Sequence, residues 1–541
     1  MTLRPQLKLL VLPALLLLVG SAMGLKMFPL YSGGGIYNAD PSYAYLFNGL
    51  LLLAQKVPHH IDHPGTPLQT LIAVLAYGQW YVLKLFNGAN ADVVVAVMAE
   101  PERYLLFISR VLLVINGAAV LLLGKKVYQH TSSIIFAMFC QCSLLTYGIF
   151  GTKLLYPAPE ALIACLSLCM LAVLTPFIFD SHATEKEQTR SALLTGLIFG
   201  IGFATKLTFL PMAGLFLLLK TWRQVGLACA AAIFAWLLGI LPMISKLPGL
   251  FNWAYNMLTH TGKYGGGSKG LIDYGQIQGH FNALVSAFPF FYFALVAFAV
   301  YLAYCLGAWI LQNNKTNTEQ RAAVQIAHQT KYPRTIAILL TVCVVQTLIV
   351  LKHFGQHYMI AVLPIAFIGI VLIVKPFAKY GFKIEVALKG VLTIVAASLV
   401  FSSSYSALSI LKTERIQHNR SVARVHAELA KHPNPLVIGS YGCYLPQCGL
   451  LFGIEYAPAI NKKMGTNLAN FFGFNVWNSM LLIDGHGFYP LSVLQPFFLA
   501  QRPVFLLTQT DFPAFDVFNK DLVLEDGGQK LYKINGVKLS Q

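Results

Sequence analysis

The chain has 541 residues, of which 56% are hydrophobic and only 11% are charged, and its mean hydropathy is +0.63. A soluble domain ordinarily carries about 25% charged residues, so this composition excludes a soluble protein and indicates a polytopic helical membrane protein. The net charge of +18 would suit nucleic acid, but the basic residues are scattered in short loops between apolar runs. That distribution is typical of membrane proteins, so we expect the lipid bilayer as a partner and no nucleic acid.

Apolar runs of about 20 residues predict the transmembrane helices. The first run, residues 9–29, also has features of a signal peptide, with Lys8 before it and small residues at 21–24. It is longer than the apolar part of such peptides, and we therefore favour a helix that is retained. In chain order the eleven predicted spans are 9–29, 104–124, 132–150, 158–179, 192–206, 208–220, 224–244, 287–311, 335–351, 358–375 and 386–404.

The basic residues orient these spans. With Arg4 and Lys8 in the cytoplasm, every basic cluster between spans lies there too, as the positive-inside rule requires. Two long loops, 31–103 and 245–286, then lie on the outer side together with the polar tail that starts at 405. We expect a protein of the bacterial inner membrane with a cytoplasmic N-terminus and a periplasmic or extracellular C-terminal domain.

Residues 68–86 are apolar enough to span the bilayer, but a span here would move every later basic cluster to the outer side. We therefore place them as an amphipathic helix in the outer interface and expect a second such helix over 41–56. Segments 192–206 and 208–220 are short for a bilayer of about 30 Å. They are predicted to form a helical hairpin with Lys206 at its outer tip. Residues 1–404 as a whole are expected to form one transmembrane domain.

The tail, residues 405–541, is long enough for one small domain. Short strands are predicted at 435–439, 503–508, 522–524 and 531–534, and a helix at 415–431, which together indicate a small α/β fold. Cys443 and Cys448 could form a disulfide in an oxidising compartment. A reduced pair or half of a metal site is the alternative. The other seven cysteines fall within predicted spans and are read as core residues.

Asp40 follows the first span and directly precedes Pro41. An aspartate before a proline often begins a helix, and capping is the simplest reading. A capping carboxylate is also held at a fixed point near the membrane surface. From there it could act as a general base that takes the proton of an attacking hydroxyl.

A histidine-rich turn follows in the same outer loop. His59, His60, Asp62 and His63 could be metal ligands, or they could form a polar interfacial turn. The spacing is not that of a known zinc site. Pro64, Gly65 and Pro67 predict a bend that carries His60, Asp62 and His63 back toward Asp40.

Cations recur on the predicted outer side. Each one alone could be a lysine that reaches the interface with its long side chain. Because a charge at helix depth costs roughly 2.5–3.5 kcal/mol, several on one face indicate a shared anion, and a lipid-linked phosphate fits best. Glu160 begins a span, where a carboxylate suits the helix dipole, and it could equally bind substrate. The cationic candidates are Lys153, Lys206, Lys352, His357, His260 and Lys263.

These motifs together resemble the GT-C glycosyltransferases, in the branch of the protein O-mannosyltransferases and the lipid A aminoarabinose transferase. Residues 37–45 resemble the acidic motif, with Asp40 at the position of the catalytic base and Tyr43 beside it as a substrate-binding residue. Residues 63–68 resemble the turn before the interfacial helix, 147–160 the outer end of the third span, 203–206 the Thr-Lys step, and 356–364 the tyrosine-containing helix start. The chain departs from the pattern where Pro41 and Ser42 replace a second acid and where His63 replaces a lysine.

The resemblance implies transfer of a sugar from a polyprenyl-phosphate donor to an extracytoplasmic glycan, lipid or protein, with inversion at the anomeric carbon. Asp40 would take the acceptor's proton, and Lys206 with Lys352 or His357 would stabilise the leaving phosphate. No obligatory cofactor is expected. The alternative is a transporter or flippase of lipid-linked saccharides. Transporters often contain internal repeats and mid-membrane charges, whereas this sequence shows no repeat and its polar residues gather at one face.

Overall fold

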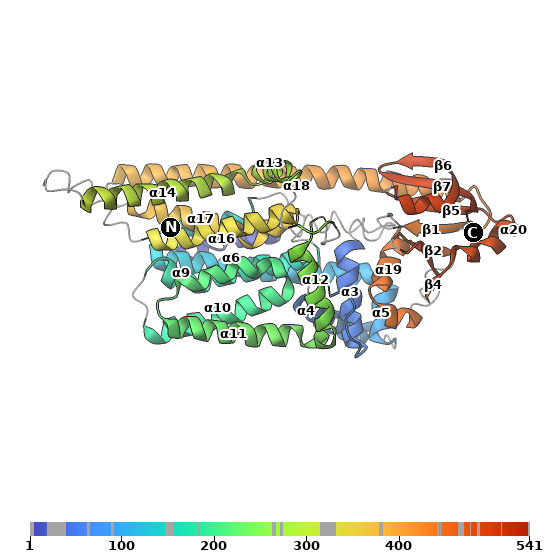
Figure 1. Cartoon of the computed structure of the whole chain (residues 1–541), viewed down its shortest axis with the longest axis horizontal. Helices are drawn as coiled ribbons and strands as arrows, with labels where there is room; N and C mark the ends of the chain where they lie inside the picture. The colour runs from blue at the N-terminus through green and yellow to red at the C-terminus, as the bar shows by residue number, and fades with distance from the viewer. Residues whose placement is uncertain are drawn as a thin grey trace.

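The computed structural model describes most of the chain. The described residues are 5–18, 39–61, 65–87, 91–146, 156–180, 184–261, 267–270, 274–313, 332–377, 382–440, 443, 445–463, 470–476, 478–483, 487–509 and 511–538. Long helices lie side by side along the longest axis of the molecule, and a β-sheet stands at one end of this bundle (Figure 1). The structure therefore confirms the predicted fold class, a helical membrane protein with a small C-terminal α/β domain.

Six of the described helices are long and apolar enough to cross a membrane, and they match six of the predicted spans. These stretches are Pro101–Thr131, Pro159–Ile178, Trp222–Thr259, Pro289–Ile310, Pro333–Lys352 and Val386–Tyr405. Predicted spans 132–150, 208–220 and 358–375 correspond to shorter apolar helices, and residues 11–18 of the first predicted span are helical. Eleven spans in total stays a prediction.

The bundle is formed by helices that follow one another along the chain. They are α1 (Pro5–Lys8), α6 (Pro101–Thr131), α7 (Ile134–Gln141), α9 (Pro159–Ile178), α10 (Glu185–Thr205), η2 (Leu207–Leu218), α11 (Trp222–Ile240), α14 (Pro289–Asn313), α16 (Pro333–Lys352), η5 (Gln356–Ala361), α17 (Leu363–Phe377) and α18 (Phe382–Leu429). The predicted hairpin is present as α10 and η2, with Lys206 between them. The second arm is a 3-10 helix and contains Pro211.

Two glycines allow the backbones of α10 and α11 to pack closely within the bundle. A Cβ atom on Gly196 would lie 2.1 Å from the carbonyl oxygen of Ala228, and one on Gly200 would lie 2.3 Å from that of Ala232. Two backbones can come this close only where a side chain is missing, which is a common way for membrane helices to pack.

Shorter helices collect at the end of the bundle that faces the sheet, which we call the domain-side end. They are α3 (Ala39–Leu53), α4 (Thr66–Asn87), α5 (Val93–Ala99), α12 (Leu247–Thr259) and α13 (Ile277–Ala287). Helices α3 and α12 run across the direction of the long helices (Figure 1). Helix α4 covers the predicted interfacial segment 68–86. It packs on α3 at Gly49 and exposes Tyr77, Tyr81 and Leu85; its place in the outer interface stays a prediction.

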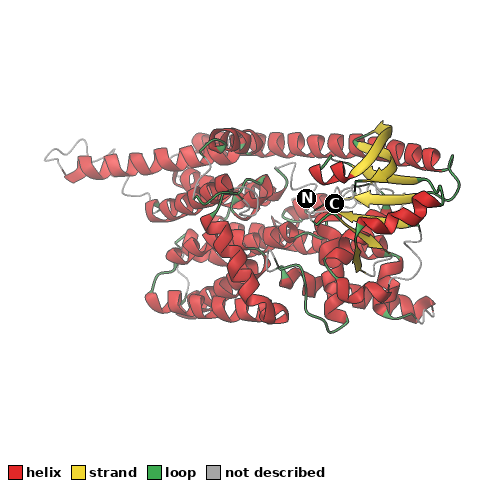
Figure 2. Ribbon diagram, turned by 45° about the vertical axis from the view of Figure 1, so that its right-hand side comes forward, coloured by secondary structure: helices red, strands yellow, loops and turns green. Residues whose placement is uncertain are grey.

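The C-terminal domain is built on a seven-stranded sheet in the order β4-β3-β2-β1-β5-β7-β6. The three central strands are parallel and the flanking strands are antiparallel. Figure 2 shows the helices beside the sheet. The elements are β1 (Leu436–Ser440), α19 (Pro446–Glu455), β2 (Phe471–Asn475), β3 (Met480–Ile483), β4 (Gly487–Tyr489), α20 (Gln495–Leu499), β5 (Val504–Thr508), β6 (Phe518–Asp526) and β7 (Gln529–Val537).

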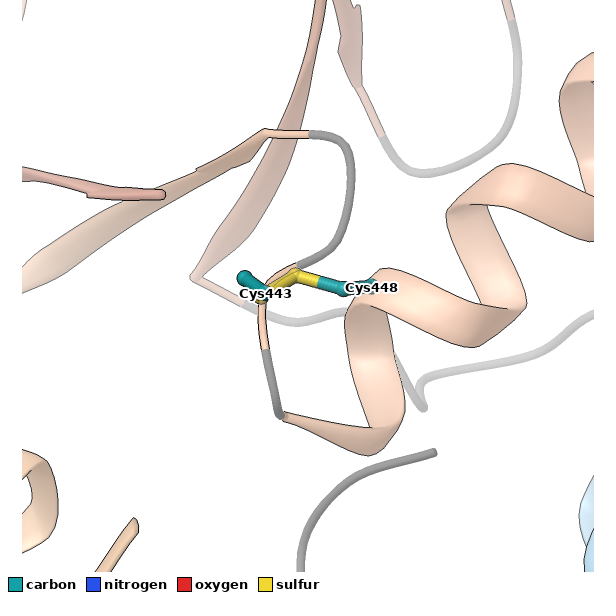
Figure 3. Close-up of a disulfide and its surroundings, with 2 residues drawn as sticks. All are labelled: Cys443 and Cys448. Carbon is teal, nitrogen blue, oxygen red and sulfur yellow. A yellow bond between two sulfur atoms is a disulfide. The ribbon is translucent and has the colours of Figure 1, made fainter. Parts of the chain in front are cut away.

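Four strands and one helix of this domain agree with prediction, whereas β2, β3, β4 and α19 were not predicted. Cys443 and Cys448 form a disulfide across a Cα–Cα distance of 5.9 Å. The bridge joins the segment after β1 to the first turn of α19 (Figure 3). It therefore closes a short loop beside the junction of β1 and α19.

Helix α18 corrects one expectation about the tail. Residues 386–404 and 415–431 were predicted as separate helices, but both belong to this one helix of 48 residues. At 1.5 Å per residue it is about 72 Å long, and it runs from the bundle into the sheet domain (Figure 1). The three serines at 402–404 make the helix more polar here. The stretch contains no glycine or proline, so the helix continues through the predicted boundary at 404.

Candidate functional site

A buried ion pair lies at the domain-side end of the bundle. Pro159 begins α9 and places Glu160 in its first turn, and α10 ends at Thr205, so that Lys206 has an extended backbone. The Lys206 ammonium donates a hydrogen bond to the Glu160 carboxylate. Only 5% and 6% of these side chains are exposed. Burying two charges is costly, and ionisable groups held at such depth commonly mark a functional site.

Two residues of η5 complete this arrangement. The Nε2 atom of His357 lies 3.7 Å from Glu160 Oε1, and the Lys206 Nζ atom lies 4.5 Å from the centre of the Tyr358 ring. Gln346 on α16 donates a 2.7 Å hydrogen bond to the Tyr358 carbonyl and so fixes η5 to the bundle. We refer to Lys206, Glu160, His357 and Tyr358 as the Lys206 cluster. His357 is more exposed than Lys206 and Glu160, with 31% of its side chain accessible.

The cluster can bind an anion for a simple geometric reason. A lysine ammonium has three N–H groups, of which one is directed to Glu160, while the aromatic face of Tyr358 stabilises the same charge. His357 is accessible and can add a second donor. The carboxylate keeps Lys206 in place before an anion arrives.

The predicted histidine-containing turn lies beside this cluster. The backbone N–H of Gly65 donates a 3.2 Å hydrogen bond to the carbonyl of Thr205, which directly precedes Lys206. Gly65 has a φ of 63°, the left-handed conformation that favours glycine. The turn thus approaches the Lys206 cluster, whereas its predicted approach to Asp40 stays a prediction. Asp62 and His63 themselves lie outside the described residues, as do Lys153 and Lys263.

Asp40 is the second residue of α3, which begins at Ala39, two residues before the predicted start at Pro41. Its side chain lies outside the described part of the structure. Tyr43, one turn later, is buried and donates a 3.3 Å hydrogen bond to Glu102 at the start of α6. The backbone that carries Asp40 is therefore joined to the bundle.

His60 is buried between two aromatic rings. The centre of its ring lies 5.2 Å from that of Tyr45 on α3 and 4.9 Å from that of Tyr456 in the C-terminal domain. Both pairs of rings meet edge to face. Among the residues that the structure describes, no three histidine, cysteine or acidic side chains form a group that could hold a metal. His60 thus packs between α3 and the C-terminal domain.

Lys352 and the predicted loop residue His260 are engaged elsewhere. The Lys352 ammonium donates to the carbonyl of Leu258, and the His353 ring lies 2.7 Å from the carbonyl of Met257. Both carbonyls belong to the last turn of α12, where basic side chains stabilise the helix end. His260 Nδ1 lies 2.9 Å from the Thr259 hydroxyl. These contacts make Lys352 primarily a cap of α12.

Sequence reasoning missed three residues at this end of the molecule. Tyr358 lies inside a motif that was recognised, but its ring was not assigned to Lys206. Asn48 and Tyr456 join α3 to the C-terminal domain through a hydrogen bond between residues 408 positions apart. A buried asparagine within an otherwise apolar helix was the available signal for Asn48.

No family model matches the chain, and no curated protein matches its sequence. Solved structures do match. The chain is similar in fold to ArnT from Cupriavidus metallidurans. The ArnT structure bound to undecaprenyl phosphate matches with 10% sequence identity and a TM-score of 0.46, over 96% of this chain and 97% of that one. The apo ArnT structure matches with 12% identity and a TM-score of 0.44 over the same shares.

Proposed function

We propose that this protein is a membrane glycosyltransferase that moves a sugar from a polyprenyl-phosphate donor to an acceptor outside the cytoplasm. The observation that carries the proposal is the Lys206 cluster, a buried ammonium held by Glu160 beside His357 and Tyr358. A site of this kind at the end of a membrane bundle suits a phosphate whose lipid chain lies in the bilayer. Undecaprenyl phosphate, which one ArnT structure contains, belongs to this class of lipid.

The proposed reaction is a single displacement. The acceptor hydroxyl attacks the anomeric carbon from the face opposite the phosphate, Asp40 takes the hydroxyl proton, and the bond from carbon to phosphate oxygen breaks. The configuration at the anomeric carbon is therefore inverted. Negative charge grows on the departing phosphate, and donors already placed around it lower the barrier most. Lys206 and His357 fill this role, and no obligatory cofactor is required because the leaving group carries a single phosphate.

Glu160 has a supporting part in this mechanism. Without a donor lipid, its carboxylate balances the Lys206 charge and holds the ammonium in one direction. When a phosphate binds, the same carboxylate limits the net positive charge of the cluster, which helps the lipid phosphate to leave after transfer. His357, being partly exposed, is the member that adjusts its contacts to the phosphate.

The proposal is tested by turnover. Purified wild type and Asp40→Asn are incubated in detergent with mixed polyprenyl-phosphate sugars and a membrane extract, and mass spectrometry follows free lipid phosphate and glycosylated product. We expect product from the wild type and a loss of at least about 100-fold in the variant, which is the typical contribution of a general base. Equal activity in a folded Asp40→Asn variant would reduce Asp40 to a helix cap. Uptake of a lipid-linked saccharide into vesicles without product would favour a transporter instead.

A further inference from the structure

Asn48 lies in the middle of α3 and is fully buried. Asparagine is a poor helix former, and here its side chain uses all of its hydrogen-bonding capacity. The Nδ2 group donates to the carbonyls of Ala44 (2.7 Å) and Tyr456 (3.2 Å). The Oδ1 atom accepts from the backbone N–H groups of His59 (2.7 Å) and His60 (3.0 Å). No other residue type presents two donors and two acceptors in this shape except the longer glutamine.

These bonds join α3 to two other segments of the chain. Ala44 belongs to α3 itself, whereas His59 and His60 precede the turn that reaches Thr205 beside the Lys206 cluster. Tyr456 is the C-cap of α19 in the C-terminal domain. Carbonyls at a helix C-terminus lack partners within the helix, and Asn48 supplies the partner for this one.

The packing around Asn48 is equally close. A Cβ atom on Gly453 of α19 would lie 2.5 Å from the Phe47 ring of α3, so the two helices approach to a distance that only glycine permits. The His60 ring is held between Tyr45 and Tyr456. Gln69 of α4 donates a 3.0 Å hydrogen bond to the His60 carbonyl. The junction therefore includes α3, α4, the segment at 59–60 and the C-terminal domain.

We infer that Asn48 is a positioning residue through which the C-terminal domain fixes the helix that carries Asp40. The inference rests on the proposed function. Asp40 precedes Asn48 by eight residues of the same helix, about 12 Å along its axis, so a displacement of α3 at Asn48 moves the Asp40 backbone with it. An error of about 1 Å in the placement of a reacting group can reduce a rate about 100-fold. The C-terminal domain would thus contribute to the site by fixing the position of α3.

Two substitutions at Asn48 distinguish its hydrogen bond to Tyr456 from those with His59 and His60. Asn48→Asp keeps an oxygen that accepts from His59 and His60 but loses the N–H group that binds the Tyr456 carbonyl. Asn48→Ala loses all of these hydrogen bonds. If the domain contact positions α3, both variants should lose at least about tenfold in kcat, while the donor KM stays within about threefold because the Lys206 cluster is untouched. Wild-type kcat in Asn48→Asp would overturn the inference.

Gln141→Ala is the matched control. Gln141 is also a fully buried amide, and it donates to the carbonyls of Leu9 and Val120 within the bundle, away from α3. Its loss should lower thermal stability as much as Asn48→Ala does while kcat stays within about threefold of wild type. An equal loss of kcat in both variants would show that Asn48 acts only through stability and would overturn the positioning role.

A second measurement needs no substrate. Gly453→Ala forces α19 away from Phe47 and leaves Asn48 intact. We expect faster hydrogen exchange, by at least about tenfold, at the amides of α3 and of residues 59–60 in Gly453→Ala and in Asn48→Asp. Unchanged exchange in both would overturn the coupling whatever the enzyme does. If the coupling is seen and the wild type transfers no sugar, the proposed reaction fails and the joint between domain and helix stands.

Discussion

The role of Lys206 must be tested together with that of its partner Glu160. From sequence alone, replacing it should weaken donor binding and leave the fold intact. The structure shows that its ammonium is the partner of a buried Glu160. Removing one member of a buried ion pair typically costs 3–5 kcal/mol because the other charge is left without a partner. Low activity in a single variant would therefore combine lost stability with lost phosphate binding.

The double variant Lys206→Met with Glu160→Gln separates the two effects. Both replacements are neutral and close in size to the originals, so we expect stability within about 1.5 kcal/mol of wild type. Donor binding should fall by at least about tenfold because the phosphate loses a charge-assisted hydrogen bond. Thermal unfolding and donor titration measure the two quantities. A folded double variant with wild-type donor affinity would remove Lys206 from the phosphate site.

At the scale of single elements, α18 is the most informative helix. Its membrane part is apolar and mostly exposed in the isolated chain, and its far end packs under the β6–β7 hairpin. Arg420 and Arg424 approach Asp526 of the hairpin at 3.4 and 3.3 Å, and the Ser421 hydroxyl donates to the Asp526 carbonyl at 2.8 Å. One continuous helix thus connects the apolar bundle to the sheet.

His418 makes this contact sensitive to acid. Burial lowers the pKa of His418 from its ordinary 6.5 to about 4. The unfolded chain therefore binds a proton more readily than the folded one between these values, and stability falls as the pH drops from about 6.5 to about 4. The full loss is about 3 kcal/mol. His418→Leu should flatten this dependence in thermal unfolding from pH 7 to pH 4; an equally steep dependence in the variant would assign it to other groups.

Breaking α18 tests whether its continuity matters. Ser402 is exposed in the middle of the helix, where a proline removes a hydrogen bond and costs about 3 kcal/mol or more. We expect Ser402→Pro to kink the helix, detach the sheet domain from α3 and reduce turnover at least about tenfold. Ser402→Ala, a better helix former, is the control and should behave as wild type. Limited proteolysis within residues 400–410 would report the kink, and a protease-resistant, fully active Ser402→Pro would show that the helix need not be continuous.

At the scale of the whole molecule, the sequence was most informative where the signal is local. Apolar runs located the six long helices, and short apolar strands such as β1 and β5 were found because they are continuous and end at polar residues. Strand β2 was missed because its aromatic run is interrupted by Gly473. Glu160 and Lys206 were each selected, but no single sequence indicates that residues 46 positions apart form one pair. For the same reason, the hydrogen bond from Asn48 to Tyr456 could not be predicted.

The bond between Asn48 and Tyr456 also has a consequence for the order of biosynthesis. The two residues are 408 positions apart, and at 5–20 residues per second a ribosome needs about 20 to 80 s to travel between them. Through that interval α3 exists without the partner that completes its hydrogen bonds. The proposed base is therefore placed only after the last quarter of the chain has been made and folded. A nascent or truncated protein should accordingly be inactive toward the lipids around it.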